Sequence, residues 1–277
     1  MRNRIDLDYS PNTLCSAVET QMLEDSAAGN HPRYQRGREE RPIFVLGSLA
    51  QGNTAMKKKT VFLFDVDNTL LDNDRVTADL RGHLEREVGH ERQERYWSIF
   101  EDLRAEVGYA DYLGALQVYR ANYPQDLHVL TVSHFLLEYP FPERLFPDAL
   151  EVVNGVKQYG VPVVLSDGDV VFQPHKIRRS GVYDAFDGAV LIYVHKEVEL
   201  ENVAQRYPAD HYVLVDDKLR ILAAVKEVWG ELVTTEFVRQ GHYAHDEKAI
   251  LGYRTADYTI ERIGDSLKLD FGVLTKN

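Results

Sequence analysis

Acidic side chains follow two apolar runs that are typical of buried strands. Residues 61–64 run directly into Asp65 and Asp67, and the segment HYVLVDD ends in Asp216 and Asp217. Adjacent carboxylates at the end of a buried strand repel one another unless a cation lies between them. Mg²⁺ prefers such oxygen ligands. The pattern allows a divalent cation site, although DVD taken alone is more often a strand followed by an Asx-type turn whose acids are solvated.

Polar residues also end two further apolar runs. VPVVLSDGD ends as a strand at Ser166, and AVLIYV (189–194) is followed by His195 and Lys196. Apolar strands that alternate with helical segments are typical of a parallel sheet with helices on both faces. In such a sheet the carboxyl ends of the strands meet along one rim. We therefore predict an α/β fold with a doubly wound parallel sheet that gathers these residues.

The expected elements alternate along most of the chain after residue 59. Strands are expected at 61–64, 161–166, 189–194, 211–217 and 231–238, with a short strand and a closing helix within 258–271. Helices are expected at 147–160, 170–181, 196–207 and 218–230. About 90 residues separate the first two strands, which is far more than an ordinary crossover needs. The long segment has helical spacing, so residues 75–144 are predicted to form a helical cap over the rim.

Four motifs occur in one order, and together they resemble the haloacid dehalogenase (HAD) superfamily. They are DVDNT at 65–69, LSDG at 165–168, a downstream lysine, and VDD at 215–217. The resemblance covers about residues 59–240. It implies a HAD-like Rossmannoid core with an inserted cap, and membership of a group dominated by Mg²⁺-dependent phosphohydrolases.

The resemblance also implies roles for the first motif. Asp65 would bind Mg²⁺ with one carboxylate oxygen and attack phosphorus with the other, which forms an aspartyl-phosphate. Asp67 would protonate the leaving alcohol and then deprotonate water, and its backbone carbonyl would bind the metal. Asn68 and Thr69 would shape a turn that presents backbone amides to the phosphate.

The remaining motifs would complete the site. Ser166 would donate its hydroxyl to a phosphoryl oxygen, helped by the amides of Asp167 and Gly168. A lysine would neutralise phosphoryl charge and restrain the nucleophile. Lys196 is favoured because its spacing from the last motif suits the family, and Lys176 is its rival.

The last motif would close the metal site. Asp217 is placed as the direct Mg²⁺ ligand and Asp216 as a second ligand, either direct or through water. An alignment shifted by one residue would exchange them. Without a cation, two adjacent buried acids would repel each other, so a purely structural interpretation is weak here.

The function predicted from these residues is a Mg²⁺-dependent phosphatase that acts on a small phosphorylated metabolite. Asp67 argues against dehalogenation, because a halide needs no acid to leave. A phosphomutase would use the same residues, and a catalytically silent HAD-like binding protein is a third interpretation. A phospho-receiver module has its phospho-acceptor after the third strand and lacks the insertion, so the order of motifs disfavours it.

Composition supports an ordinary globular protein. The 277 residues carry a net charge of -12, which disfavours nucleic-acid and anionic-membrane partners. Cys15 is the single cysteine and no run of 18 apolar residues occurs, so we expect a cytoplasmic protein. Residues 1–55 are polar and broken by Pro and Gly, so we expect a disordered extension, with Met56 as an alternative natural start. The core domain would then comprise 56–74 and 145–277.

Some aromatic and histidine residues are assigned no chemistry at this stage. Trp97, Tyr109 and Tyr112 are interpreted as packing residues of the cap. The segment GHYAHDE, which contains His242, Tyr243 and His245, is interpreted as a surface loop.

Overall fold

The central sheet has seven strands in the described part of the chain. The computed structural model describes the backbone of residues 44–46 and residues 59–274. The strand order is β1-β4-β3-β2-β5-β6-β7. The strands are β1 (Phe44–Leu46), β2 (Thr60–Phe64), β3 (Val161–Asp167), β4 (Val190–Tyr193), β5 (His211–Asp216), β6 (Val233–Val238) and β7 (Tyr258–Ile260). Neighbouring strands are parallel except β1, which pairs antiparallel with β4.

Strand β2 occupies the middle of the parallel set. The chain runs outward from β2 through β3 and β4, and then returns to the other side of β2 as β5. The direction of winding therefore reverses between β2 and β5. Ligands of open α/β sheets bind at the carboxyl ends of the strands beside such a reversal.

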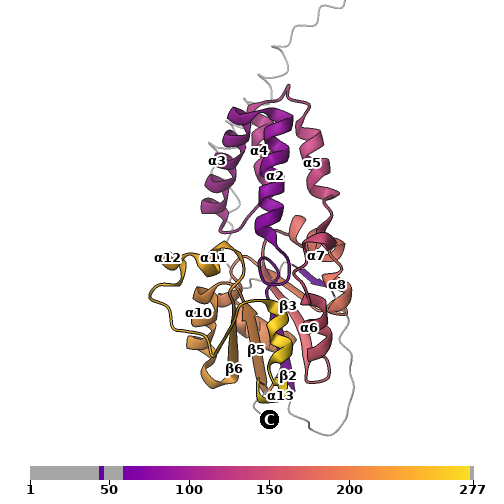
Figure 1. The fold of residues 1–277 in the computed structure, drawn as a ribbon. Helices are drawn as coiled ribbons and strands as arrows, with labels where there is room; N and C mark the ends of the chain where they lie inside the picture. The colour runs from indigo at the N-terminus through magenta and orange to yellow at the C-terminus, as the bar shows by residue number, and fades with distance from the viewer. Residues whose placement is uncertain (1–43, 47–58, 275–277) are drawn as a thin grey trace, which may run out of the picture. The chain divides into compact units, whose positions relative to one another are not determined.

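Helices cover both faces of the sheet (Figure 1). One face packs against α6 (Ala149–Val156), α7 (Phe172–Arg179), α8 (Val182–Ala185) and α13 (Phe271–Leu274), and the other against α9 (Leu200–Arg206) and α10 (Leu219–Trp229). In β2, Phe62 and Phe64 join the first core cluster, whereas Val61 and Leu63 join the second. Because side chains alternate along a strand, an all-apolar strand is buried on both faces.

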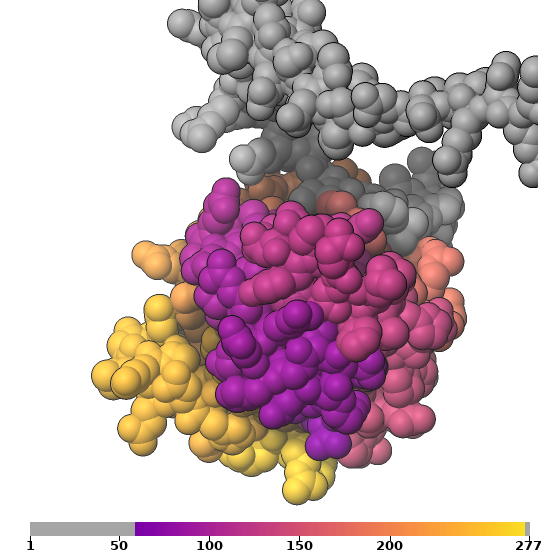
Figure 2. All heavy atoms as spheres, turned by 90° about the horizontal axis from the view of Figure 1, so that it is seen from above, coloured from indigo at the N-terminus to yellow at the C-terminus, as the bar shows by residue number. Residues whose placement is uncertain are grey.

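Four of the helices between β2 and β3 form the cap. They are α2 (Asn73–Val88), α3 (His90–Val107), α4 (Tyr112–Asn122) and α5 (Val129–Leu137). Figure 1 places them beyond the carboxyl ends of the strands, and Figure 2, viewed from above, shows their residues in indigo to magenta over the middle of that face. Trp97 and Tyr112 are buried among their aromatic neighbours, as expected for packing residues.

The doubly wound sheet and the helical insertion agree with the sequence prediction. The main differences are short elements: β1 was not expected, and GHYAHDE forms the helix α11 (Gly241–His245), followed by α12 (Glu247–Ile250). The 3₁₀ segments η1 (Phe141–Arg144), η2 (Lys196–Val198), η3 (Gly230–Leu232) and η4 (Ile263–Lys268) join larger elements. Apart from residues 44–46, the extension expected at 1–55 lies outside the described residues.

None of the helices within residues 59–274 has the length and apolar character needed to cross a membrane.

Candidate active site

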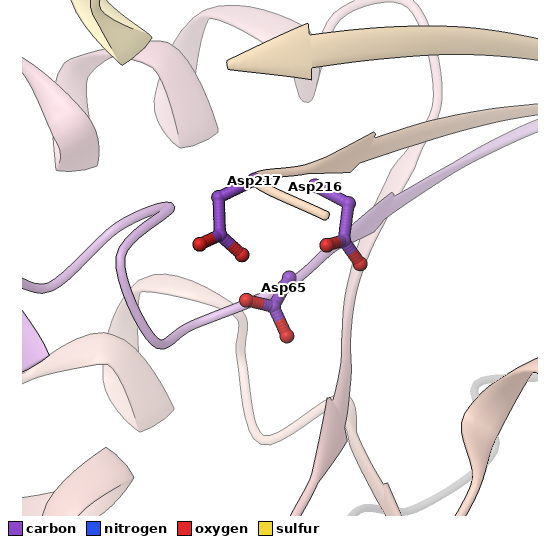
Figure 3. Close-up of side chains that lie close together, drawn as sticks. All are labelled: Asp65, Asp216 and Asp217. Atoms are coloured by element: carbon purple, nitrogen blue, oxygen red, sulfur yellow. The ribbon is translucent and has the colours of Figure 1, made fainter. Parts of the chain in front are cut away.

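Three buried aspartates meet where the winding of the sheet reverses. Asp65 follows β2, Asp216 ends β5 and Asp217 comes next, and one carboxylate oxygen of each lies within 4.8 Å of the others (Figure 3). The ladder register explains the meeting, because Phe64 pairs with Val215 and the next residue of each strand is an acid. Each of the three is at most 2% exposed. Their charges therefore need compensation from within the protein or from a bound cation.

The ammonium of Lys196 compensates two of these carboxylates. Its Nζ lies 2.5 Å from Oδ1 of Asp65 and 2.7 Å from Oδ2 of Asp216. Burial opposes the charged form of this lysine, but Asp216 and Asp65 outweigh it and hold the pKa of Lys196 well above its usual range. The lysine that the sequence favoured therefore sits as a fixed cation beside the predicted nucleophile.

Asp217 has no such partner. Neither of its carboxylate oxygens finds a hydrogen-bond donor among the described residues. Burial raises the pKa of Asp217 well above its usual value, although Lys218 opposes the shift. Burial likewise raises the pKa of Asp216 to about 6, against the effect of Lys196. A divalent cation among these oxygens would stabilise the ionised acids, and an all-oxygen donor set suits Mg²⁺. The residues present therefore fit a magnesium ion.

Asp67 lies outside this cluster, in a second ion pair. Its Oδ1 is 2.5 Å from Nζ of Lys176, and its Oδ2 accepts a hydrogen bond of 3.4 Å from Nε2 of Gln173. Lys176 also donates to Oδ1 of Asn73, the first residue of α2, at 3.1 Å. The two lysines that were rivals in the sequence therefore contact different aspartates. Because the side chain of Asp67 points to Lys176, only its backbone carbonyl is left for the predicted metal contact.

Gln173 connects Ser166 to this second pair. Its Nε2 donates to Oγ of Ser166 at 2.9 Å, and the same group reaches Asp67. Ser166 in turn donates to the carbonyl of Asp167 at 3.2 Å. One amide therefore fixes the predicted phosphoryl donor and the predicted acid relative to each other. Sequence reasoning did not identify this glutamine.

The backbone amide of Gly168 has a different partner from the predicted one. It donates to the Tyr193 carbonyl at 3.0 Å, because the pairing of β3 with β4 continues past Asp167. The predicted help of this amide to a phosphoryl oxygen is therefore not supported. Glycine is needed here for another reason, since a Cβ would lie 2.7 Å from Cγ of Gln173. The Asp167 carboxylate accepts the amide of Lys196 at 2.8 Å and so positions the lysine.

Asn68 shapes the turn after β2. Its φ is 62°, in the left-handed region that asparagine tolerates better than most residues. Its Nδ2 donates to Oδ1 of Asp74 at 3.0 Å, and its Oδ1 accepts the Asp74 amide at 3.1 Å. Asn68 therefore holds the turn against the start of the cap.

Thr69 contacts the nucleophile candidate, which its predicted role did not include. Its Oγ1 donates to Oδ2 of Asp65 at 3.2 Å. The amides of Asn68 and Thr69 donate to main-chain carbonyls of the turn, whereas those of Val66 and Asp67 have no backbone acceptor within residues 59–274. The turn therefore leaves the amides of Val66 and Asp67 available to other acceptors.

A cavity of about 370 Å³ opens beside these residues, with walls from both the core and the cap. The core contributes Asp67 and Gly168, and the cap contributes Arg104 and Tyr109. Arg104 of α3 donates to the hydroxyl of Tyr243 in α11. Tyr109 and Tyr243, which the sequence gave no site role, therefore border the site.

Comparison with known proteins agrees with this geometry. A family profile described as haloacid dehalogenase-like hydrolase matches residues 59–228. The chain belongs to the haloacid dehalogenase-like hydrolases. A solved HAD-like hydrolase from Burkholderia xenovorans LB400 is 57% identical, with 78% of this chain and 98% of that chain covered and a TM-score of 0.74.

More distant HAD-like structures share the fold. The magnesium-bound HAD-hydrolase YfnB from Bacillus subtilis is 17% identical over 76% of this chain and 98% of its own, with a TM-score of 0.51. L-2-haloacid dehalogenase from Xanthobacter autotrophicus is 16% identical over the same shares, also with a TM-score of 0.51. A comparison with functionally curated proteins found no significant match. These distant structures share the HAD-like fold of the chain.

Proposed function

We propose that this HAD-like hydrolase is a Mg²⁺-dependent phosphatase that hydrolyses a small phosphorylated metabolite through an aspartyl-phosphate on Asp65. The observation that carries the proposal is the separation of the two acids of DVD. Asp65 lies in the acid cluster with Lys196, whereas Asp67 lies 2.5 Å from Lys176 and borders the cavity. A nucleophile in a cation-binding cluster and a separate acid–base group are what an ester of a poor leaving group requires.

In the first step, a carboxylate oxygen of Asp65 attacks phosphorus while the bond from phosphorus to the ester oxygen breaks. Lys196 on Oδ1 and Thr69 on Oδ2 fix the plane of the carboxylate for this attack. Asp67 gives a proton to the departing oxygen, so that an alcohol leaves. Ser166, held by Gln173, would turn its hydroxyl from the Asp167 carbonyl to a phosphoryl oxygen.

In the second step, Asp67 takes a proton from water, and the water oxygen attacks the phosphorus of the aspartyl-phosphate. The bond between phosphorus and Asp65 breaks, so inorganic phosphate leaves and the carboxylate is restored. Mg²⁺, held by Asp65, Asp216, Asp217 and the Asp67 carbonyl, would neutralise the charge on the phosphoryl oxygens when bound. Asp217 is the preferred direct ligand because its oxygens have no other partner in the described chain.

Two features support phosphoryl transfer over dehalogenation. Asp67 supplies an acid that an alkoxide leaving group needs and a halide does not. The cavity of about 370 Å³ is within the range for small ligands, which favours a metabolite as substrate. A single cysteine in 277 residues suits a reducing, cytoplasmic setting for this reaction.

The test is release of inorganic phosphate from a panel of phosphorylated metabolites, with Mg²⁺ and with EDTA. We expect activity with Mg²⁺, loss of activity with the chelator, and recovery when excess Mg²⁺ is restored. Asp65→Asn should lower kcat by roughly 10⁴-fold or more. Asp102→Asn, which removes an exposed carboxylate of the cap, is the matched control and should behave as the wild type.

Phosphate release by Asp65→Asn at the wild-type rate would overturn the nucleophile. Indifference to EDTA would overturn the metal site. Chloride release from a 2-haloacid, without phosphate release from any ester, would replace the phosphatase by a dehalogenase.

A further inference from the structure

Several cationic side chains line the cavity wall. Lys218, Arg104 and Lys248 all line it. Arg104 has one carboxylate contact in the described chain: its Nη1 lies 3.8 Å from Oε2 of the exposed Glu101. The Lys248 ammonium has no carboxylate partner in the described chain, whereas its backbone amide donates to Oδ1 of Asp246. Cations that face a cavity with little compensating charge attract anions, and low-dielectric walls strengthen the attraction.

Other charges of the wall already have partners. Arg220 is paired with Glu197 at 2.6 Å, and Asp67 with Lys176 at 2.5 Å. Lys218 directly follows Asp217 in the chain and also lines the cavity, so it adjoins the acid cluster. Arg104 and Lys248 are therefore the wall cations that no acid of the catalytic site compensates.

Tyr243 organises this part of the wall. Its hydroxyl accepts a hydrogen bond from Arg104 of the cap, and its ring centroid lies 5.3 Å from the Lys218 ammonium. A tyrosine that contacts two cations in this way holds them at one place without neutralising either. We call Arg104, Lys218, Tyr243 and Lys248 the Tyr243 subsite.

We propose that the Tyr243 subsite binds a second anionic group, a carboxylate or a phosphate, on the alcohol part of the phosphoester substrate. The proposal rests on the phosphatase function proposed above. Asp67, which would protonate the leaving oxygen, lines the same cavity, so the subsite lies on the leaving-group side. A guanidinium and an ammonium are the side chains that recognise such anions.

The way the cap closes supports a bounded subsite. Gly108 ends α3 with a φ of 88°, and a Cβ there would lie 2.9 Å from the imidazole of His195. The cap backbone therefore approaches the core closely, and Tyr109 and Ala110 follow as cavity wall. A small molecule that spans Asp67 and Arg104 would be enclosed there, whereas a bulky polymer would not fit in about 370 Å³.

The experiment compares esters that differ in the second anion. Glycerol 3-phosphate against 3-phosphoglycerate tests a carboxylate, and propane-1,3-diol monophosphate against the bisphosphate tests a phosphate. We expect kcat/KM to be higher for the doubly anionic ester in at least one pair, and the larger ratio identifies the anion. A ratio of one or less in both pairs would overturn the inference.

Variants then test the residues. Arg104→Met and Lys248→Met should each lower that ratio by about 10- to 100-fold, the range for a lost charge-assisted hydrogen bond. Arg104→Lys should restore part of it. Arg120→Met removes an exposed cation from α4 and is the control for net charge.

The outcomes separate the two proposals. If the esters are hydrolysed but Arg104→Met and Arg120→Met change the ratio equally, the subsite is wrong and the phosphatase function stands. If no phosphoester is hydrolysed with Mg²⁺, both proposals fall together.

Discussion

Lys196 and Lys176 are two buried lysines in very different surroundings. Each is 1% exposed, and each has Nζ 2.5 Å from a carboxylate of the DVD motif. Lys196 bridges Asp65 and Asp216 within a cluster of three acids. Lys176 pairs with one carboxylate, that of Asp67, and also donates to the Asn73 side chain at the start of the cap. The first cation leaves carboxylate charge uncompensated, and the second does not.

That difference explains how one short motif can supply two kinds of chemistry. In the proposed phosphatase, the surplus negative charge around Asp65 would hold the metal ion, and this side of the site would carry the nucleophilic attack on phosphorus. The Asp67 carboxylate is paired with Lys176 and needs no metal ion, and the proposed mechanism gives it the proton transfers with the leaving group and water. We expect the two lysines to fail differently when they are replaced.

The largest effect is expected for Lys196→Met. It would leave Asp65 and Asp216 buried without their shared cation, so the free energy of unfolding should fall by about 3–5 kcal/mol. Phosphatase kcat should fall by roughly 10²–10³-fold or more, because charge stabilisation at the phosphoryl group is lost. Urea unfolding and steady-state kinetics measure both. Equal losses of stability and of kcat in Lys176→Met would remove the distinction between the lysines.

Asp217→Asn should separate metal binding from folding. Mg²⁺ should raise the Tm of the wild type, because a ligand that binds only the folded state stabilises it. The variant should lose most of this response. In EDTA it should be more stable than the wild type by about 1–3 kcal/mol, because a buried carboxylate without a partner is removed. Thermal unfolding with Mg²⁺ and with EDTA checks both directions, and an unchanged Mg²⁺ response would exclude Asp217 as a ligand.

Lys176→Met should have a smaller effect that depends on the leaving group. Without the Lys176 ammonium, the Asp67 carboxylate is no longer held in place. The hydrolysis of esters with poor leaving groups should therefore slow by about 10- to 100-fold. Activated aryl phosphates need less protonation and should change little. The measurement is the slope of log kcat/KM against the leaving-group pKa, which should steepen. A uniform loss across all esters would make Lys176 a purely structural residue.

The core could be predicted from the sequence because its signals are local. Continuous apolar runs such as residues 61–64 identify strands buried on both faces, and the residues that follow them are fixed at the rim by the ladder. The meeting of Asp65 with Asp216 and Asp217 follows from that logic, since Phe64 pairs with Val215. The placement of Lys196 beside Asp65 follows in the same way from the end of β4.

The rest depends on packing that leaves no local pattern. The Arg104–Tyr243 contact joins residues 139 positions apart, on elements whose docking the sequence does not specify. Gln173 reaches both Ser166 and Asp67 only because α7 begins directly over the rim. The Gly168 amide was misassigned because the ladder continues one residue beyond the expected end of β3.

Glu236 is a buried acid without a lysine partner among the described residues, so it extends the comparison of Asp65 and Asp67 to a third kind of charge compensation. We expect the smallest effect here. Glu236 of β6 is 1% exposed and accepts a hydrogen bond of 2.5 Å from Ser266. Burial raises the pKa of Glu236 to about 7, although this hydrogen bond opposes the shift. A proton, rather than a lysine or a metal ion, would therefore remove its charge.

The sign of the pH effect follows from that pKa. The folded state keeps the Glu236 proton at pH values where the unfolded chain, with a pKa of 4.5, has released it. Stability from this group is therefore complete below about pH 4.5 and is lost as the pH rises to about 7, by about 3 kcal/mol in total. Glu236→Gln should flatten the pH dependence of the unfolding free energy between pH 5 and 8, stabilise the protein at pH 8, and leave kcat unchanged. The unfolding free energy of the variant could instead fall between pH 5 and 8 as much as that of the wild type. The charge that lowers stability at high pH would then belong to the acid cluster and not to Glu236.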